Sequence, residues 1–296
     1  MIANPTMRER TRSPLTLLVL GASPNSTNRG VAALGIACID NLTTAFPGAR
    51  IIVGAGGMTE TCDIELPDRT VTAETTWLRG STLLRHRSST RHLQWTRRLR
   101  WLAPGLGTRW LANRTLQQLL AADAVLDLSG GDSFADTYTP AVIDSQVAVK
   151  RLAIALGKPL ILMPQTIGPF TRDESRRAAR AILRRSALVA TRDASGLDEL
   201  RSLMGEPLDD RFVSCPDLAF TLKPMPVAEA ELPSVLRREG PVIGINVSGL
   251  LWRSNVDFGL KCDYRELTRT IMAWALDDAA AGLLLVPHTF NKRQPA

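Results

Sequence analysis

Residues 124–163, AVLDLSGGDSFADTYTPAVIDSQVAVKRLAIALGKPLILM, contain the pattern that decides the fold of this chain. A short apolar run at 124–128 leads into a glycine loop, SGGD at 129–132, and a second apolar run follows at 160–163. Between the runs, small and apolar residues recur at the spacing of one helix face: Ala148, Leu152, Ala155 and Leu156. Gly157 follows at the point where a helix commonly ends. A strand, a helix and a second strand in this order predict a βαβ unit with parallel strands.

The same alternation continues on both sides of this unit. We expect further strands at 15–20, 51–53, 188–190, 242–247 and 283–286, and further helices at 31–45, 171–185 and 264–276. Thr171 and Glu174 have the spacing of a capping box at the start of one of these helices, and Asp193 is a candidate cap for the helix after it. The pattern therefore predicts an α/β fold built on a Rossmann-like parallel sheet.

Residues 221–240 interrupt this pattern. They hold three prolines and several charges, a composition that is typical of a linker. We therefore expect an N-terminal Rossmann-like domain at 15–225, a linker at 226–240 and part of a second Rossmann-like domain at 241–296. A doubly wound domain typically needs about 100 residues or more, so we expect that the second domain is cut short.

The net charge of +7 and the isoelectric point of about 9.7 favour an anionic partner. Aromatic residues make up only 5% of the sequence, which disfavours a stacking surface for single-stranded nucleic acid, and no nucleic-acid-binding motif accompanies the charge. The four cysteines are widely spaced, so neither a zinc site nor a dithiol pair is predicted. No apolar stretch approaches the roughly 18 residues of a membrane span. We expect a cytoplasmic protein that binds no nucleic acid.

One basic stretch stands apart from the sheet pattern. Residues 85–110 hold seven arginines and three tryptophans. As a helix, this segment would place Trp95, Leu99 and Leu102 on one face, with arginines opposite. Two interpretations stay open: the apolar face packs into the core with a solvated back, or the segment makes peripheral contact with the inner face of an anionic membrane.

The loops that follow the predicted strands carry the candidate functional residues, because ligands of parallel sheets bind at the carboxyl ends of the strands. The loop GASPNSTNRG at 21–30 either presents backbone N–H groups to an anion or only turns tightly. In the SGGD loop, Gly131 allows close approach to the backbone, while Asp132 either binds sugar hydroxyls, acts as a base or caps a helix. Because each follows a strand, we expect Gly30, Gly131 and Gly168 to cluster at one edge of the sheet.

Three later loops add polar or charged side chains. In the loop PQTIGP at 164–169, the two prolines restrict the backbone. Two interpretations stay open: the rigid loop positions Gln165 to orient a polar ligand, or the loop is only a structural turn. Arg192 follows a short buried strand and suits bidentate recognition of phosphate or carboxylate, with a surface pair to Asp193 or a salt bridge at a domain interface as equal alternatives. His288 ends the last strand, where it either acts as an acid or base or lies exposed without a role.

Six segments follow one another along the chain: NRG at 28–30, SGGDSFAD at 129–136, GKPLILMPQTIGPF at 157–170, ALVATRDASGLDEL at 187–200, IGINVSGL at 243–250 and LLLVPH at 283–288. Together they resemble the polysaccharide pyruvyl transferase family. PQTIGPF and TRD are the most specific of these segments, whereas the glycine loops are weak when taken singly. The resemblance covers residues 15–288.

The resemblance implies a GT-B-like protein, in which two Rossmann-like domains face each other across a cleft. Such an enzyme moves the enolpyruvyl unit of phosphoenolpyruvate onto two hydroxyls of a cell-surface glycan or a lipid-linked sugar. The products are a pyruvate ketal and phosphate, and the mechanism demands no metal or cofactor. Arg192 matches the donor-binding arginine of the family. Our candidate assignments are donor binding for Arg192, Asn28, Gly30, Gly131, Gln165 and Gly168, and catalysis for Asp132 and His288.

One departure from the family pattern concerns an Arg-x-His motif, which supplies donor contacts and an acid in the family's second domain. The 296 residues contain no such triplet. We therefore expect this chain to show no measurable pyruvyl transfer, and we expect the strands at 242–247 and 283–286 to have uncovered faces that favour aggregation. Two alternatives stay open: a GT-B glycosyltransferase that uses a nucleotide sugar, and an inactive, truncated member of the family.

Overall fold

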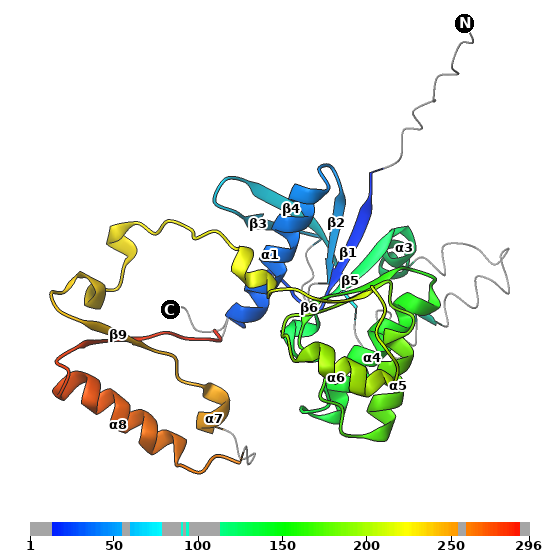
Figure 1. Cartoon of the computed structure of the whole chain (residues 1–296). Coiled ribbons are helices and arrows are strands. Elements are labelled where there is room, and N and C mark those ends of the chain that lie inside the picture. The colour runs from blue at the N-terminus through cyan, green and yellow to red at the C-terminus, as the bar shows by residue number, and fades with distance from the viewer. Residues whose placement is uncertain are drawn as a thin grey trace, which may run out of the picture. The chain divides into compact units, whose positions relative to one another are not determined.

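The computed structural model describes residues 14–54, 60–78, 90, 93–94, 113–253 and 259–290. They belong to two compact units (Figure 1): the first holds the chain up to Ser26 and from Val31 to Leu222, and the second combines Thr27–Gly30 with the chain from Lys223 onward. Most of the candidate membrane segment at 85–110 lies outside the described residues. In the described residues, no helix combines the length and the apolarity needed to cross a membrane.

The first unit is built on a sheet with the strand order β3-β4-β2-β1-β5-β6-β7-β8. Neighbouring strands are parallel except β3 and β4, which form an antiparallel hairpin. The strands are β1 (Thr16–Leu20), β2 (Arg50–Gly54), β3 (Thr61–Glu65), β4 (Thr70–Thr76), β5 (Ala124–Asp127), β6 (Leu160–Gln165), β7 (Leu188–Thr191) and β8 (Phe212–Ser214). The predicted α/β fold with a mostly parallel, Rossmann-like sheet is confirmed.

Helices connect the parallel strands and cover the sheet (Figure 1). The described ones in this unit are α1 (Arg29–Ala45), α3 (Arg114–Ala121), α4 (Pro140–Ala155), α5 (Asp173–Leu183) and α6 (Gly196–Met204). Because α1 follows β1, α4 follows β5 and α5 follows β6, each connection returns the chain to the amino end of the sheet. All the loops that leave the carboxyl ends of the parallel strands therefore lie at one edge.

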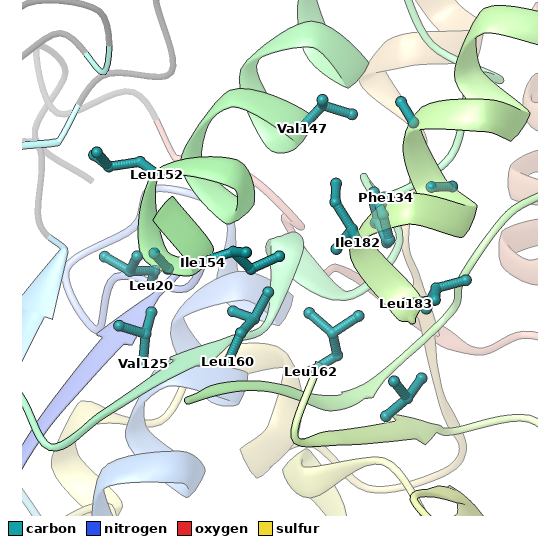
Figure 2. Close-up of a cluster of buried hydrophobic side chains, with 14 of the residues drawn as sticks. Leu20, Val125, Phe134, Val147, Leu152, Ile154, Leu160, Leu162, Ile182 and Leu183 are labelled. Carbon is teal, nitrogen blue, oxygen red and sulfur yellow. The ribbon is translucent and has the colours of Figure 1, made fainter. Parts of the chain in front are cut away.

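The central strand β1 is buried on both faces, as its unbroken apolar run requires. Successive side chains of a strand point to opposite faces of the sheet. Leu18 and Leu20 belong to the apolar cluster that includes side chains of α4 and α5 (Figure 2), whereas Leu17 and Val19 belong to the cluster that includes side chains of α1. The sheet thus has one hydrophobic core on each face.

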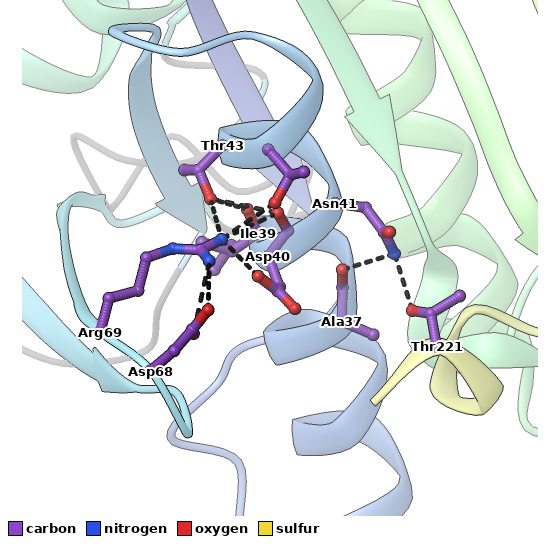
Figure 3. Close-up of polar contacts among 9 residues, drawn as sticks. Ala37, Ile39, Asp40, Asn41, Thr43, Asp68, Arg69 and Thr221 are labelled. Carbon is purple, nitrogen blue, oxygen red and sulfur yellow. Dashed lines mark hydrogen bonds and ion pairs between the residues drawn. The ribbon is translucent and has the colours of Figure 1, made fainter. Parts of the chain in front are cut away.

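The β3–β4 hairpin, which the sequence pattern did not reveal to us, is tied to α1 by an arginine in its turn (Figure 3). Nη2 of Arg69 donates hydrogen bonds to the hydroxyls of Thr43 (3.2 Å) and Thr44 (3.0 Å) and to the carboxylate of Asp40. Nη1 makes a longer contact with Asp68 in the same turn (3.4 Å). These contacts fasten the polar end of the hairpin to the last turns of the helix.

The expected capping box at Thr171 and Glu174 is wrong. The helix α5 begins at Asp173, and the side chain of its N-cap residue, Arg172, makes no capping hydrogen bond. The cap comes instead from Asp136, in the loop after β5. Its buried carboxylate accepts hydrogen bonds from the backbone N–H groups of Thr171 (2.8 Å) and Arg172 (2.9 Å). A distant carboxylate therefore occupies the N–H of Thr171, which the side chain of Glu174 would have bonded in a capping box.

In the second unit, β9 (Val242–Ile245) and β10 (Gly282–Leu285) pair in parallel, and α8 (Tyr264–Asp277) packs against β10. A short helix, α7 (Gly249–Arg253), follows β9. The expected uncovered faces of both strands are confirmed: no residue of β9 is fully buried, and Leu285 is 57% exposed. In the described part of this unit, α8 is the long helix that packs on the strand pair, and one helix covers only one face.

Asp136→Asn should destabilise the first unit by about 1–2 kcal/mol at pH 7, because an amide accepts less strongly than a carboxylate from N–H groups at a helix N-terminus. The pKa of Asp136 is lowered: burial by itself would raise it, but hydrogen bonds from the backbone N–H groups of Arg172 and Thr171 outweigh burial. A lowered pKa gives stability above the unfolded-state value of about 3.9, and this stability is lost as the pH falls through the folded-state value.

Urea unfolding of the wild type and of Asp136→Asn at pH 7 and at pH 3 measures both effects. The difference between the two proteins should be smaller at pH 3 than at pH 7, because pH 3 lies below the unfolded-state value of about 3.9, where the stability that the lowered pKa supplies declines. Asp144→Asn, at an exposed position of α4, is the matched control and should change stability by less than about 0.5 kcal/mol. An equal difference at both pH values would contradict a role for the ionised carboxylate.

Candidate functional site

The loop after β5 stays in the left-handed backbone region for three successive residues. Ser129, Gly130 and Gly131 have φ values of 45°, 64° and 95°, a region that glycine adopts at little cost. The N–H of Gly130 donates to the carbonyl of Gly21 (2.6 Å), and the N–H of Gly131 donates to that of Leu128 (2.8 Å). Because these N–H groups are used within the protein, the glycine pair supplies a tight turn rather than a cradle for an anion.

Gly21, which follows β1, packs directly against this turn. A Cβ at position 21 would lie 2.3 Å from the backbone nitrogen of Ser129, a distance that no side chain can occupy. The strands β1 and β5 are also the pair at which the strand order reverses, where α/β sheets commonly bind ligands. In this protein the backbones of Gly21 and Ser129 are in contact at that point. This contact favours the interpretation that Gly21 serves a tight turn. The polar side chains gather instead over the ends of β5, β6 and β7.

A buried lysine lies beneath the loop after β5. Nζ of Lys150, on α4, is 2.9 Å from Oδ1 of Asp127 and donates a hydrogen bond to the hydroxyl of Ser129 (2.7 Å), which itself donates to Asp127 (2.6 Å). All three residues are at most 1% exposed, and Nζ also lies 4.5 Å from the centre of the Phe134 ring. Burial lowers the pKa of Lys150, and the charge of Asp127 opposes that shift. The network holds Ser129 at the start of the left-handed turn.

We did not predict this network, although the sequence holds a signal for it. Lys150 occupies a helix position that shares a face with the buried Ile143, Val147 and Ile154. Asp127 likewise interrupts the apolar run of β5. Charged residues are almost never fully buried unless they are paired, so one charge in each of two adjacent core elements indicates a buried ion pair.

Gln165 lies in the core, just below the sheet edge. Its Nε2 donates hydrogen bonds to the backbone carbonyls of Asp127 (2.7 Å) and Met163 (3.1 Å), and the residue is fully buried. Its Oε1 has no hydrogen-bond partner among the described residues. The amide thus holds the ends of β5 and β6 together, whereas Thr166, the next residue of the loop, is partly exposed.

Arg192 follows β7 and is held at the edge by two neighbours. Its Nε donates to the hydroxyl of Thr166 (2.9 Å), and its Nη1 donates to Oδ2 of Asp217 (2.8 Å). Asp193, the partner that we considered from the sequence, is farther away at 3.9 Å. A Cβ at Gly131 would lie 3.0 Å from Nη1, so the bare backbone of that glycine makes room for the guanidinium. The sequence pattern gave no sign of Asp217 as the main partner.

Asp132 does not cap α4, because Thr139 is the N-cap residue of that helix. Oδ2 of Asp132 accepts a hydrogen bond from the hydroxyl of Tyr138 (2.8 Å) instead. This hydrogen bond, followed by burial, raises the pKa of Tyr138, while the charge of Arg192 acts in the opposite direction. Tyr138, which we did not single out from the sequence, therefore stays protonated near neutral pH and shares one electrostatic environment with Asp132 and Arg192.

The loop after β6 runs beside the loop after β5. The N–H of Gly168 donates to the carbonyl of Phe134 (2.9 Å), and its φ of 84° again requires glycine. Asp193, which we considered as a cap for α6, does not cap it: Ser195 is the N-cap residue, and the carboxylate of Asp193 accepts a hydrogen bond from the hydroxyl of Thr166 (2.7 Å). The loops after β5, β6 and β7 are therefore linked to one another.

The remaining candidates, Asn28, Gly30 and His288, lie together in the second unit. The N–H of Arg29 donates to the carbonyl of His288 (3.0 Å), and the N–H of Gly30 donates to Oδ1 of Asn28 (3.0 Å). A Cβ at Gly30 would lie 3.6 Å from Cε1 of His288. We did not foresee that the segment after β10 runs beside these residues. The expected clustering of Gly30 with the two glycines of the first unit stays a prediction.

A model of the polysaccharide pyruvyl transferase family matches residues 28–276, most of the chain. The chain belongs to the polysaccharide pyruvyl transferase family. No curated protein matches it significantly. Membership of the pyruvyl transferase family indicates the general function of a transferase, and the matched region includes the polar groups of the sheet edge from Asp132 to Asp217.

In this pyruvyl transferase family member, Lys150→Met should destabilise the first unit by about 3–5 kcal/mol, because it leaves the carboxylate of Asp127 buried without a cation. Asp127→Asn in the same chain removes that charge, so the double variant should be more stable than Lys150→Met alone. Urea unfolding followed by circular dichroism measures the difference. Arg151→Met, at the exposed neighbouring position, is the control. A double variant as unstable as the sum of the two single variants would argue against the ion pair.

Proposed function

We propose a pyruvyl transferase function, in which phosphoenolpyruvate binds at the carboxyl edge of the large sheet and its pyruvyl unit goes to two hydroxyls of a glycan or a lipid-linked sugar. We also propose that turnover by these 296 residues alone is not measurable, because they contain no Arg-x-His triplet. The donor assignment rests on the exposure and the hydrogen bonds of the Arg192 side chain. Its side chain is 27% exposed and is fixed by Thr166 and Asp217 at the end of a strand. In a family whose general function is pyruvyl transfer, a fixed and partly exposed guanidinium suits the phosphate and carboxylate of the donor.

Arg192 can offer two parallel N–H groups to this donor. Its Nη1 is held by Asp217, whereas Nη2 has no hydrogen-bond partner among the described residues. A donor anion that replaced the Asp217 carboxylate would receive hydrogen bonds from both nitrogens, the bidentate arrangement that phosphate and carboxylate prefer. Asp217 thus keeps the guanidinium paired and oriented while no donor is bound.

The proposed reaction adds two sugar oxygens to C2 of phosphoenolpyruvate. The first hydroxyl loses its proton as its oxygen bonds to C2, and C3 gains a proton. The second hydroxyl then loses its proton as its oxygen replaces the phosphate, which leaves with the electron pair of the C–O bond. Asp132 is our candidate for the base and His288 our candidate for the acid, while Arg192 stabilises the charge on the departing phosphate. The scheme uses no metal or cofactor.

We place this reaction in the cytoplasm as part of the proposal. A lipid-linked acceptor would be presented at the inner face of a membrane. The basic segment at 85–110 is our candidate for peripheral contact with that surface.

Arg192→Lys should weaken the affinity for phosphoenolpyruvate at least about tenfold, because lysine lacks the planar fork and each lost charged hydrogen bond costs roughly 1.5–3 kcal/mol. Isothermal titration calorimetry with phosphoenolpyruvate measures this affinity whether or not the chain turns over. Arg201→Lys changes an exposed arginine of α6 that pairs with Asp198 and is the matched control. Unchanged affinity in Arg192→Lys would remove the donor assignment, and tighter binding of a nucleotide sugar would favour the glycosyltransferase alternative.

Asp217→Asn should act in the opposite direction and raise the affinity for phosphoenolpyruvate about threefold to tenfold, because the donor no longer has to displace a carboxylate. The amide oxygen of the variant can still accept the hydrogen bond from the N–H of Ala219, which the carboxylate accepts in the wild type (2.8 Å). The same titration measures the gain. A loss of affinity in Asp217→Asn would show that Asp217 only orients Arg192.

A further inference from the structure

Tyr138 places an exposed aromatic ring beside the carboxylate of Asp132. It lies in the loop after β5, directly before Thr139 at the start of α4. Its hydroxyl donates to Oδ2 of Asp132 at 2.8 Å, yet the residue is 46% exposed. The reaction scheme above gives Tyr138 no role, so a ring that is anchored through its hydroxyl and left open to solvent is unexplained.

The two oxygens of Asp132 differ in what they contact. Oδ2 is occupied by the hydroxyl of Tyr138, and the raised pKa of this tyrosine keeps it in the donating form. Among the residues that the structure describes, Oδ1 makes only a long contact of 3.4 Å with the hydroxyl of Ser133. Oδ1 is therefore the oxygen that can accept from an incoming hydroxyl, and the bond from Tyr138 fixes the direction in which the carboxylate points.

We propose that Tyr138 and Asp132 form the acceptor site, in which the ring of Tyr138 covers one C–H face of a pyranose and Oδ1 of Asp132 accepts a hydrogen bond from a sugar hydroxyl. The proposal rests on the proposed function for the expectation that the acceptor is a sugar. A pyranose has an apolar C–H face and a rim of hydroxyls, so an aromatic ring next to a free carboxylate oxygen matches both of its surfaces.

The same geometry places the acceptor next to the proposed donor. Gly131 precedes Asp132, and a Cβ on it would lie 3.0 Å from Nη1 of Arg192. The charge of Arg192 also reaches Tyr138. A sugar hydroxyl on Asp132 and an anion on Arg192 would therefore meet at one edge of the sheet. In this arrangement Asp132 is the catalytic residue, and Tyr138 positions both the carboxylate and the sugar.

Methyl β-D-galactopyranoside and methyl α-D-glucopyranoside are suitable probes, because each presents a pyranose without an ionised group. Saturation-transfer NMR on the full chain should show transfer to the protons of one C–H face, and a titration should give the affinity. Tyr138→Leu should weaken binding at least about fivefold, because it removes the ring and the hydroxyl. Tyr138→Phe keeps the ring, so it should retain the same C–H pattern and lose about twofold in affinity.

Two controls separate a lost sugar site from a misfolded protein. Phe220→Leu changes an aromatic residue of the same unit that is 87% exposed, and it should leave the sugar affinity unchanged. The affinity of each Tyr138 variant for phosphoenolpyruvate should stay within about twofold of the wild-type value, because that donor is held by other groups.

Equal sugar affinity in the wild type and in Tyr138→Leu overturns the proposal, and so does the absence of sugar binding by the wild type. If Tyr138→Leu fails to fold, Tyr138→Phe decides: a wild-type affinity or a different C–H pattern in that variant also overturns it. Failure of the wild type to bind phosphoenolpyruvate removes the donor assignment of the proposed function instead. Sugar binding and phosphoenolpyruvate binding are measured separately, so failure of the acceptor site can be distinguished from failure of the donor site.

Discussion

Lys150 and Asp127 carry opposite charges at two positions from which the fold excludes water. Burying either charge alone would cost roughly several kcal/mol. The helix α4 can therefore pack on β5 only in an arrangement that brings Nζ of Lys150 next to the carboxylate of Asp127. The hydroxyl of Ser129 completes the network and is thereby held in a left-handed backbone conformation. The rest of the edge depends on that turn. The carbonyl of Gly131 accepts a hydrogen bond from the N–H of Thr166 (2.8 Å), which ties the loop after β6 to the loop after β5.

Close approach between loops explains why glycine stands at several strand ends, and it also decides where a ligand can bind. A Cβ at Gly21 would collide with the backbone of Ser129, and a Cβ at Gly196 would collide with the side chain of Thr191. At the reversal of strand order the loop after β1 thus packs backbone against backbone on the loop after β5. Groups that can meet a ligand are displaced toward β6 and β7, where Arg192 has the space left by Gly131.

The parallel strands and their helices could be predicted from the sequence because their patterns are local. The run at 15–20 became β1, and the run at 160–163 became part of β6. The β3–β4 hairpin was not predicted in this way, since its strands mix buried and exposed side chains and contain no apolar run. The ion-pair partners of the charged residues could not be predicted for another reason. Asp217 is 25 residues from Arg192 in the chain, and only the three-dimensional approach of their loops makes it the counter-ion.

The balance of charge at the sheet edge limits what Arg192 can do alone. Two carboxylates, those of Asp193 (3.9 Å) and Asp217 (2.8 Å), lie beside this guanidinium, and a third, that of Asp132, is bonded to the neighbouring Tyr138, so acidic groups outnumber Arg192 here. Phosphoenolpyruvate brings a phosphate and a carboxylate, and like charges at short range oppose its binding. Displacing Asp217 from Nη1 relieves part of that repulsion but not all of it. Strong donor binding at this edge therefore requires positive groups in addition to Arg192.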